Sequence, residues 1–285
     1  MAERYRIYKE RSREKNMVKQ IIANGIEIGY QDRGQGEPLV LVMGLGASSL
    51  KWEPHILCYE KHFRVLAIDN RGSGLSAKPE CESYSIADMA ADVISLLDAL
   101  GIERAHVNGI SMGGAVAQYL AIYYPERVKS VILTNTFPRC NVSFRRCIEF
   151  LRDAVDQLDG RSFGRIAQWM IFSSVFQDRN EAYLLDAEAN DADATNPMPA
   201  YAYKAQCNAI LAFDESANLG KIQAPVLVVA GDHDLLATVP LVMEMVNAIP
   251  NCRLHMVKDG GHVQHWEDLE GYNRVTLDFL LEQEK

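Results

Sequence analysis

The sequence predicts an α/β fold in which a mostly parallel sheet has helices on both faces and carries an inserted helical cap. Three observations lead to this prediction. Short and mostly apolar runs, typical of strands buried on both faces, alternate with stretches of helical periodicity. The alternation is interrupted once, between residues 136 and 221, where only helical patterns occur. A serine between two glycines also lies where one expected strand passes into a helical pattern.

The regular part of the chain opens with two short alternating runs, 18–23 and 26–31, joined by Asn24 and Gly25. Asn-Gly is well suited to a type I′ turn, so we expect an antiparallel hairpin here. The other expected strands are short and mostly apolar, most clearly at 38–43 and 225–230, with helical patterns between and after them. These strands cover 38–43, 64–68, 104–108, 128–133, 225–230 and 253–257, and the two clearest helices cover 86–100 and 270–282.

The long interruption should be structured, because featureless loops of this length are rare in compact domains. Its helical patterns cover residues 144–158, 163–173, 181–190 and 201–213. The sequence therefore predicts three parts, namely a charged N-terminal extension (1–17), a core (18–135 and 222–285) and a helical cap or lid (136–221).

Composition restricts the partners. The net charge of −9 over 285 residues argues against nucleic acid, which is bound through clustered lysine and arginine. Basic residues do crowd the first nineteen positions, but interleaved glutamates favour a solvated extension over a binding arm. No apolar run has the length of a signal peptide or a membrane span, so we expect a soluble, cytoplasmic protein without membrane insertion.

The cysteines and histidines indicate no metal. Six cysteines are scattered without C-x-x-C or metal-ligand spacing, which favours neither a zinc site nor a disulfide framework. We therefore expect reduced cysteines and no metal or other cofactor.

The most informative stretch is Gly109-Ile110-Ser111-Met112-Gly113, which has G-x-S-x-G spacing. A stretch that reads as a short buried strand, 104–108, precedes it and a small-residue helical pattern follows, as a sharp strand-to-helix turn requires. Glycines are needed on both sides because the strained turn brings neighbouring backbone too close for side chains. Ser111 is therefore a candidate nucleophile.

A serine hydroxyl needs a base and an acid that orients the base. Asp232 and Asp234 both follow the run 225–230, at the edge of an open α/β sheet where sites assemble. His262 lies in a glycine-rich loop after the last expected strand. The residues alone leave both aspartates open as the acid.

From about residue 18 onward, the chain resembles the α/β-hydrolase superfamily, in its lidded branch of serine esterases, lactonases and C–C hydrolases. The resemblance implies an α/β-hydrolase fold and a catalytic triad of Ser111, His262 and Asp234, because the family pattern Gly-x-x-Asp matches Gly231 to Asp234. The other family position for the acid holds Asn135, which has no carboxylate. Four blocks carry the resemblance: Met43 to Gly46, Asp69 to Ser76, Gly109 to Gly114, and the pair of Asp234 and His262.

Several further residues receive expected roles. The backbone amides of Leu45 and Met112 are the candidate oxyanion hole, since donors are needed where a carbonyl oxygen becomes charged. The block from Asp69 to Ser76 is expected to be structural, with Arg71 tying loops together. His265 is expected to pack or cap near the last helix, and His233 to be a loop residue.

The cap is rich in large apolar and aromatic side chains, which favours a substrate with an apolar part. Our hypothesis is hydrolysis of a small to medium, partly apolar carboxylic ester or lactone through an acyl-enzyme. The alternatives are hydrolysis of a C–C bond in a ring-cleavage diketone, and a non-catalytic ligand-binding receptor. Whether the chain forms a homodimer stays open. The candidate substrate contacts are Gly44, Trp169, Phe172 and Val263.

Overall fold

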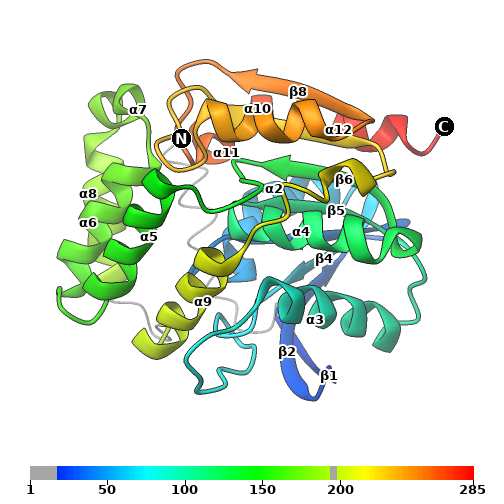
Figure 1. Ribbon diagram of the computed structural model, residues 1–285, viewed down its shortest axis with the longest axis horizontal. Coiled ribbons are helices and arrows are strands. Elements are labelled where there is room, and N and C mark those ends of the chain that lie inside the picture. The colour runs from blue at the N-terminus through cyan, green and yellow to red at the C-terminus, as the bar shows by residue number, and fades with distance from the viewer. Residues whose placement is uncertain (1–17, 193–197) are drawn as a thin grey trace.

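The computed structural model describes residues 18–192 and 198–285, so the expected extension 1–17 lies outside the described residues. Within them, eight strands form one sheet in the order β1-β2-β4-β3-β5-β6-β7-β8 (Figure 1). β1 and β2 form an antiparallel pair, β2 is antiparallel to β4, and all other pairs are parallel, which confirms the predicted mostly parallel sheet. The strands are β1 (Lys19–Ala23), β2 (Ile26–Arg33), β3 (Glu37–Val42), β4 (Phe63–Ile68), β5 (Ala105–Ile110), β6 (Val128–Thr134), β7 (Val226–Gly231) and β8 (Cys252–Val257).

The predicted hairpin is β1 and β2. Asn24 and Gly25 both have positive φ, 50° and 73°, as the two central residues of a type I′ turn require. The Asn24 amide also donates to Asp92 Oδ1 at 2.8 Å, which fixes the turn against a helix of the core.

Helices cover both faces of the sheet. In β3, Val40 and Val42 face one apolar core and Leu39 and Leu41 face the other, as the alternation of side chains along a strand dictates. The first core is completed by α3 (Ile86–Ala99), α4 (Met112–Tyr123) and α10 (Val239–Ala248). The second is completed by η1 (Ser49–Trp52), α2 (Glu53–Tyr59) and α12 (Leu269–Glu282).

A helical cap lies between β6 and β7, as predicted, and gathers at one end of the sheet (Figure 1). α6 packs on α8, where Arg165 and Glu188 form an ion pair at 3.0 Å, and α5 packs on α9. The six-residue α7 was not predicted, because so short a helix shows no clear periodicity. The cap helices are α5 (Val142–Ala154), α6 (Gly160–Ile171), α7 (Ser174–Arg179), α8 (Glu181–Ala192) and α9 (Ala200–Ala212).

The short elements complete the chain and lead to the site. They are η2 (Pro125–Arg127), η3 (Leu219–Lys221) and α11 (Gln264–Glu267). Parallel strands end at one edge of the sheet, so the residues that follow β5, β6, β7 and β8 meet there. Among the described residues no helix is both long and apolar enough to cross a membrane.

Candidate active site

Ser111 lies on the sharp turn between β5 and α4. Its φ of 55° and ψ of −118° are strained for a residue with a side chain. The neighbouring glycines explain how the turn closes. A Cβ on Gly109 would lie 2.1 Å from Gly113 O, and a Cβ on Gly113 would lie 2.1 Å from Val42 O. Larger residues at either position would therefore collide with backbone.

Four hydrogen bonds hold the Ser111 backbone in this conformation. Its amide donates to Thr134 O at 2.9 Å, which ties the turn to the end of β6. Its carbonyl accepts from Thr136 Oγ1 at 2.7 Å and from the amides of Gly114 and Ala115 at 2.9 and 3.1 Å. Only 9% of the residue is exposed, so the hydroxyl sits in a largely enclosed place.

His262 bridges the serine and an aspartate. Its Nε2 lies 2.9 Å from Ser111 Oγ, and its Nδ1 lies 2.8 Å from Asp234 Oδ2. An ionised carboxylate only accepts hydrogen bonds, so Nδ1 carries the proton and Nε2 presents its lone pair to the serine hydroxyl. This arrangement allows the imidazole to take the hydroxyl proton.

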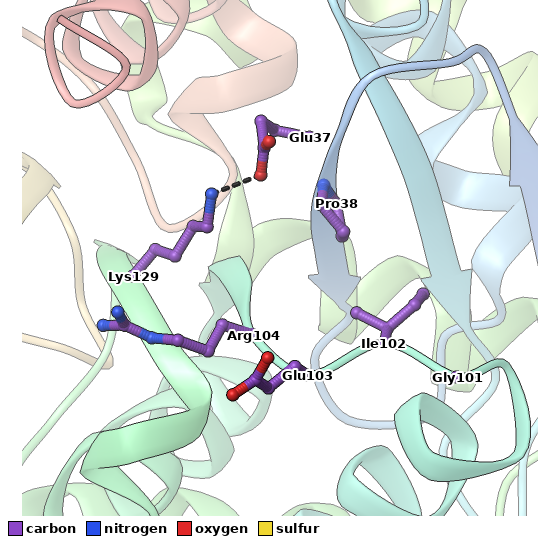
Figure 2. A pocket seen from close by; sticks show the side chains of 7 residues that line it. All are labelled: Glu37, Pro38, Gly101, Ile102, Glu103, Arg104 and Lys129. Carbon is purple, nitrogen blue, oxygen red and sulfur yellow. Dashed lines mark hydrogen bonds and ion pairs between the residues drawn. The ribbon is translucent and has the colours of Figure 1, made fainter.

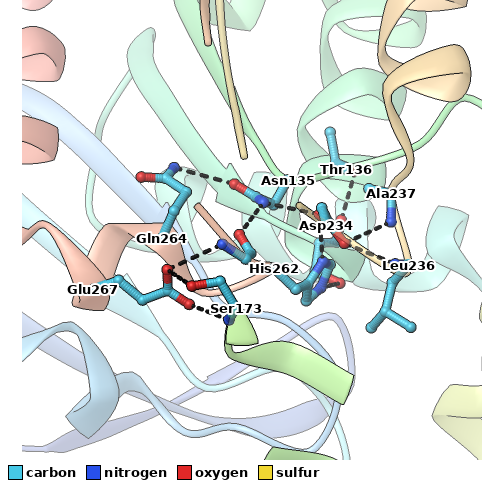
Figure 3. A network of polar contacts seen from close by, with 11 residues as sticks. Asn135, Thr136, Ser173, Asp234, Leu236, Ala237, His262, Gln264 and Glu267 are labelled. Carbon is cyan, nitrogen blue, oxygen red and sulfur yellow. Dashed lines mark hydrogen bonds and ion pairs between the residues drawn. The ribbon is translucent and has the colours of Figure 1, made fainter. Parts of the chain in front are cut away.

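Asp234 follows β7 and is held by donors on both oxygens. The amides of Leu236 and Ala237 donate to Oδ1 at 2.7 and 3.0 Å. Oδ2 accepts from His262 and also from Asn135 Nδ2 at 2.8 Å (Figure 3). Four donors around a side chain that is 6% exposed match a charged carboxylate.

Asn135 is a site residue whose role the sequence did not reveal. It follows β6, with a left-handed φ of 43° that asparagine tolerates better than most residues. Its Nδ2 donates to Asp234 and, at 2.9 Å, to Gly261 O, while its Oδ1 accepts from Gln264 Nε2 at 3.1 Å. The amide thus joins the aspartate to the loop that carries the histidine. The sequence feature that could have indicated this role is its position directly after β6, at the sheet edge where the site residues meet.

The candidate oxyanion-hole amides are that of Met112, directly after Ser111, and that of Leu45, in the loop after β3. Met112 is the first residue of α4, and Gly44, beside Leu45, is so near that an added Cβ would lie 3.7 Å from Ser111 Oγ. Neither amide donates a hydrogen bond to another described residue. The loop is fixed by its neighbours, because Asn70 Nδ2 donates to Met43 O at 2.8 Å and the Gly46 amide donates to Gln206 Oε1 at 2.9 Å. Both amides therefore fit the expected oxyanion hole, which stays a prediction.

The expected substrate contacts lie in different surroundings. Phe172 and Val263 are buried in one small cluster with Phe176, on which Phe172 stacks at 4.9 Å between ring centroids. Gly44 lies against Ser111. Trp169 on α6 is 57% exposed, so much of its ring faces solvent. Contact of any of these four residues with substrate stays a prediction.

The rival residues lie outside the hydrogen-bonded group. Asp232 and His233 are exposed, and His233 Nε2 lies 4.0 Å from Asp259. His265 is buried in α11 against the rings of His55, Trp266 and Tyr272. Arg71 forms a two-pronged ion pair with Asp92 on α3, at 2.7 and 2.8 Å, which suits the expected loop-tying role.

A hollow lies at the opposite edge of the sheet from Ser111. It is lined by Glu37 at the start of β3, by Arg104 just before β5, and by Lys129 in β6 (Figure 2). Lys129 is paired there with Glu37. These residues stand at the amino ends of the strands, so the hollow is separate from Ser111. Among the described residues no three or more histidine, cysteine or acidic side chains gather as a metal site would need.

Comparison with known proteins identifies one family and several relatives. The model for the alpha/beta hydrolase fold matches residues 37–269. A relative named "Putative carbamate hydrolase RutD" from Variovorax paradoxus is 33% identical over 246 residues, which are 86% of this chain and 92% of that protein.

Solved structures are similar over nearly the whole chain. The enol-lactonase from Burkholderia xenovorans LB400 matches with a TM-score of 0.82 and 29% identity, over 92% of this chain and 100% of that one. Est816, described as an N-acyl homoserine lactone degrading enzyme, matches with a TM-score of 0.80 and 27% identity over the same shares.

Proposed function

Because the chain belongs to the alpha/beta hydrolase fold family, we propose that it is a serine hydrolase that cleaves a small to medium, partly apolar carboxylic ester or lactone. The observation that carries the proposal is the continuous path of hydrogen bonds from Ser111 Oγ through His262 to Asp234. Such a path lets an imidazole remove the serine proton as the oxygen attacks a carbonyl carbon. The lactonases among the similar structures support the same class of substrate.

In the acylation step, Ser111 Oγ forms a bond to the carbonyl carbon and its proton passes to His262 Nε2. The carbonyl π electrons move onto the oxygen, and the amides of Leu45 and Met112 donate to the resulting oxyanion. Asp234 stabilises the imidazolium through Nδ1. The bond from carbon to the alcohol oxygen then breaks, and Nε2 returns its proton to the departing alkoxide.

Deacylation repeats these steps with water. His262 Nε2 takes a proton from water as the water oxygen bonds to the acyl carbon, and the oxyanion forms again at the same two amides. When it collapses, the bond to Ser111 Oγ breaks and the serine recovers its proton. For a lactone, the alcohol and the acid are released as one hydroxy acid.

The surroundings of the serine favour a substrate with an apolar portion. The cluster of Phe172, Phe176 and Val263 adjoins His262 through Val263, its neighbour in the chain. Apolar walls with a few polar groups are typical of small-molecule sites. An acyl or alcohol group of moderate size would find apolar contacts here.

Carbamate hydrolysis is the second candidate, and the name of the 33% identical relative favours it. A carbamate carbonyl is attacked through the same tetrahedral intermediate, but its nitrogen makes the carbon less electrophilic. A panel of esters, lactones and N-alkyl carbamates with matched alkyl groups distinguishes the two. Higher kcat/KM for esters and lactones supports the first candidate, and higher kcat/KM for carbamates supports the second.

The direct test is hydrolysis of p-nitrophenyl butyrate by the native protein and by Ser111→Ala. We expect kcat to fall roughly 10⁴- to 10⁶-fold, because the nucleophile and its base act as a unit. A fluorophosphonate should label the native protein at Ser111 and leave the variant unlabelled. Undiminished turnover by the variant would refute Ser111 as the nucleophile.

A further inference from the structure

Glu267, the last residue of α11, joins the cap to the loop of His262 with a single carboxylate. Its Oε1 accepts from the Ser173 amide at 2.7 Å. Its Oε2 accepts from Ser173 Oγ at 3.0 Å and from the Gly261 amide at 3.0 Å (Figure 3). Ser173 belongs to the cap, where its hydroxyl also caps α7 by accepting from the Phe176 amide.

The chain on the other side of the histidine contacts the same part of the cap. The Val263 amide donates to Ile171 O at 3.1 Å, and the Val263 side chain packs against Phe172 and Phe176. Both neighbours of His262 are therefore linked to cap residues 171–173. Val263 donates a hydrogen bond directly to Ile171, whereas Gly261 is linked to Ser173 through the Glu267 carboxylate, which accepts from both.

Cap residues 171–173 approach Gly261 so closely that no side chain would fit at this position. A Cβ on Gly261 would lie 2.4 Å from Ser173 N and 2.7 Å from both Ile171 O and Glu267 Oε1. From the core side, Asn135 Nδ2 donates to Gly261 O at 2.9 Å. The Gly261 residue is thus held at its carbonyl by the core and at its amide by the cap, through Glu267.

We propose that Glu267 is a positioning residue. Through it, the position of the His262 ring depends on the position of cap residues 171–173 relative to the histidine loop. The inference rests on the proposed hydrolysis, because it concerns the base of that reaction. Loss of the carboxylate frees the Gly261 amide and the Ser173 contact together, so the histidine loop gains freedom. A misplacement of about 1 Å at a catalytic group can cost on the order of 100-fold in rate.

The same link has a consequence for substrate choice. A substrate that lifts residues 171–173 shifts Ser173, and the shift reaches His262 through Glu267. Bulky substrates are therefore expected to lose kcat, and not only affinity. The cap in this proposal acts on the chemical step as well as on binding.

The test uses Glu267→Gln, with Glu282→Gln as the matched control. A glutamine at 267 still accepts from the Ser173 amide, but its NH₂ group faces the Gly261 amide as a second donor. Glu282 is exposed and pairs with Arg253 at 2.8 Å. It is the last residue of α12, and this end of the helix lies on the side of the molecule away from the cap (Figure 1). Two quantities are measured, namely kcat and KM for p-nitrophenyl butyrate, and the low-field ¹H NMR signal of the His262 Nδ1 proton, assigned by its loss in His262→Gln.

For Glu267→Gln we expect kcat to fall between about 10- and 100-fold with a smaller change in KM, and the low-field signal to broaden or disappear. Glu282→Gln should keep both native values. Native kcat in Glu267→Gln, a change in KM alone, or a fall in kcat with an unchanged proton signal would each overturn the proposal. If Glu267→Gln does not fold, Ser173→Ala is judged by the same readouts; it removes one hydrogen bond to the carboxylate together with the side-chain cap of α7.

The two proposals fail separately. If the native protein hydrolyses none of the esters, lactones or carbamates, the proposed function is refuted, and the NMR signal alone decides the role of Glu267. If the native protein is active and Glu267→Gln equals it in kcat and signal, the function stands and the positioning role is refuted.

Discussion

At the scale of single residues, Asp234 and Asp232 are two identical side chains whose surroundings differ. Asp234 is buried and accepts four hydrogen bonds, one of them from His262. Asp232, two residues earlier, is exposed. Burial with matched donors gives the first carboxylate a fixed orientation, which the second lacks. The pair therefore offers a clean comparison of the same substitution in two settings.

We predict that Asp234→Asn lowers kcat for p-nitrophenyl butyrate by roughly 10³- to 10⁴-fold, because an amide no longer fixes the His262 tautomer that leaves Nε2 free. Asp232→Asn should keep kcat within about twofold, since surface changes away from the site have small effects. Steady-state kinetics of both variants decides this. Equal losses in the two variants would contradict the assignment of Asp234.

The residues also show how far sequence reasoning reaches. Ser111 and its glycines were predictable because the turn is local, and the distances from Gly109 and Gly113 to nearby backbone explain the motif. Glu267 and Ser173 were not predictable as partners, because they lie 94 positions apart and meet only when the cap is folded onto the core. The role of Asn135 likewise depends on β6 and β7 being neighbours in the sheet.

At the scale of elements, the turn from β5 to α4 depends on how closely α4 approaches β3. Gly113 in the first turn of α4 lies against the end of β3, where a Cβ would meet Val42 O at 2.1 Å and Met43 O at 2.7 Å. Met43 also begins the loop that carries Leu45. Any displacement here therefore moves the Leu45 amide away from Ser111 and from the Met112 amide.

We predict that Gly113→Ala destabilises the protein by about 1–3 kcal/mol, the usual cost of overpacking, and lowers kcat for p-nitrophenyl butyrate. Gly164→Ala in α6 is the control, because its Cβ would meet nothing within 4 Å and alanine is the better helix former by about 0.5–1 kcal/mol. Urea unfolding of the two variants should give changes of opposite sign. A Gly113→Ala protein as stable and active as the native one would contradict the packing argument.

Prediction of whole elements succeeded where a pattern is local and long. The hairpin with Asn24 and Gly25, the mostly apolar strands and the longer cap helices all follow from such patterns. The short α7 and α11 did not, because each is fixed by tertiary contacts, with Ser173 capping α7 and Glu267 ending α11. Their arrangement against the histidine loop could come only from the folded chain.

At the scale of the whole molecule, the second apolar core contains a set of buried aromatic and imidazole rings behind the candidate site. His55 of α2 lies 5.5 Å from His265 of α11 and 5.2 Å from Tyr272 of α12, measured between ring centroids. This set joins α2, near the start of the chain, to α11 and α12, which follow each other near its end. His55 Nδ1 lies 2.6 Å from Asn273 Oδ1, and both ring nitrogens of His265 lack a hydrogen-bond partner among the described residues.

We predict that this ring set makes global stability fall as the pH drops below about 6.5. Burial lowers the pKa of His55 to about 4, and burial lowers the pKa of His265 well below its usual value, with smaller contributions from the charges of His55 and His262. The unfolded chain binds protons at these histidines near pH 6.5 while the folded chain does not, so stability is complete above that pH and is lost on acidification toward pH 4. Protonation of His55 alone lowers the free energy of unfolding by roughly 3 kcal/mol over this range, since one unit of pKa difference is about 1.4 kcal/mol.

Urea unfolding at pH 7 and pH 5 measures the loss of stability. His265→Phe, which keeps a stacking ring without a titrating nitrogen, should show a smaller loss than the native protein. Equal losses in the two proteins would show that His265 does not contribute to the acid sensitivity.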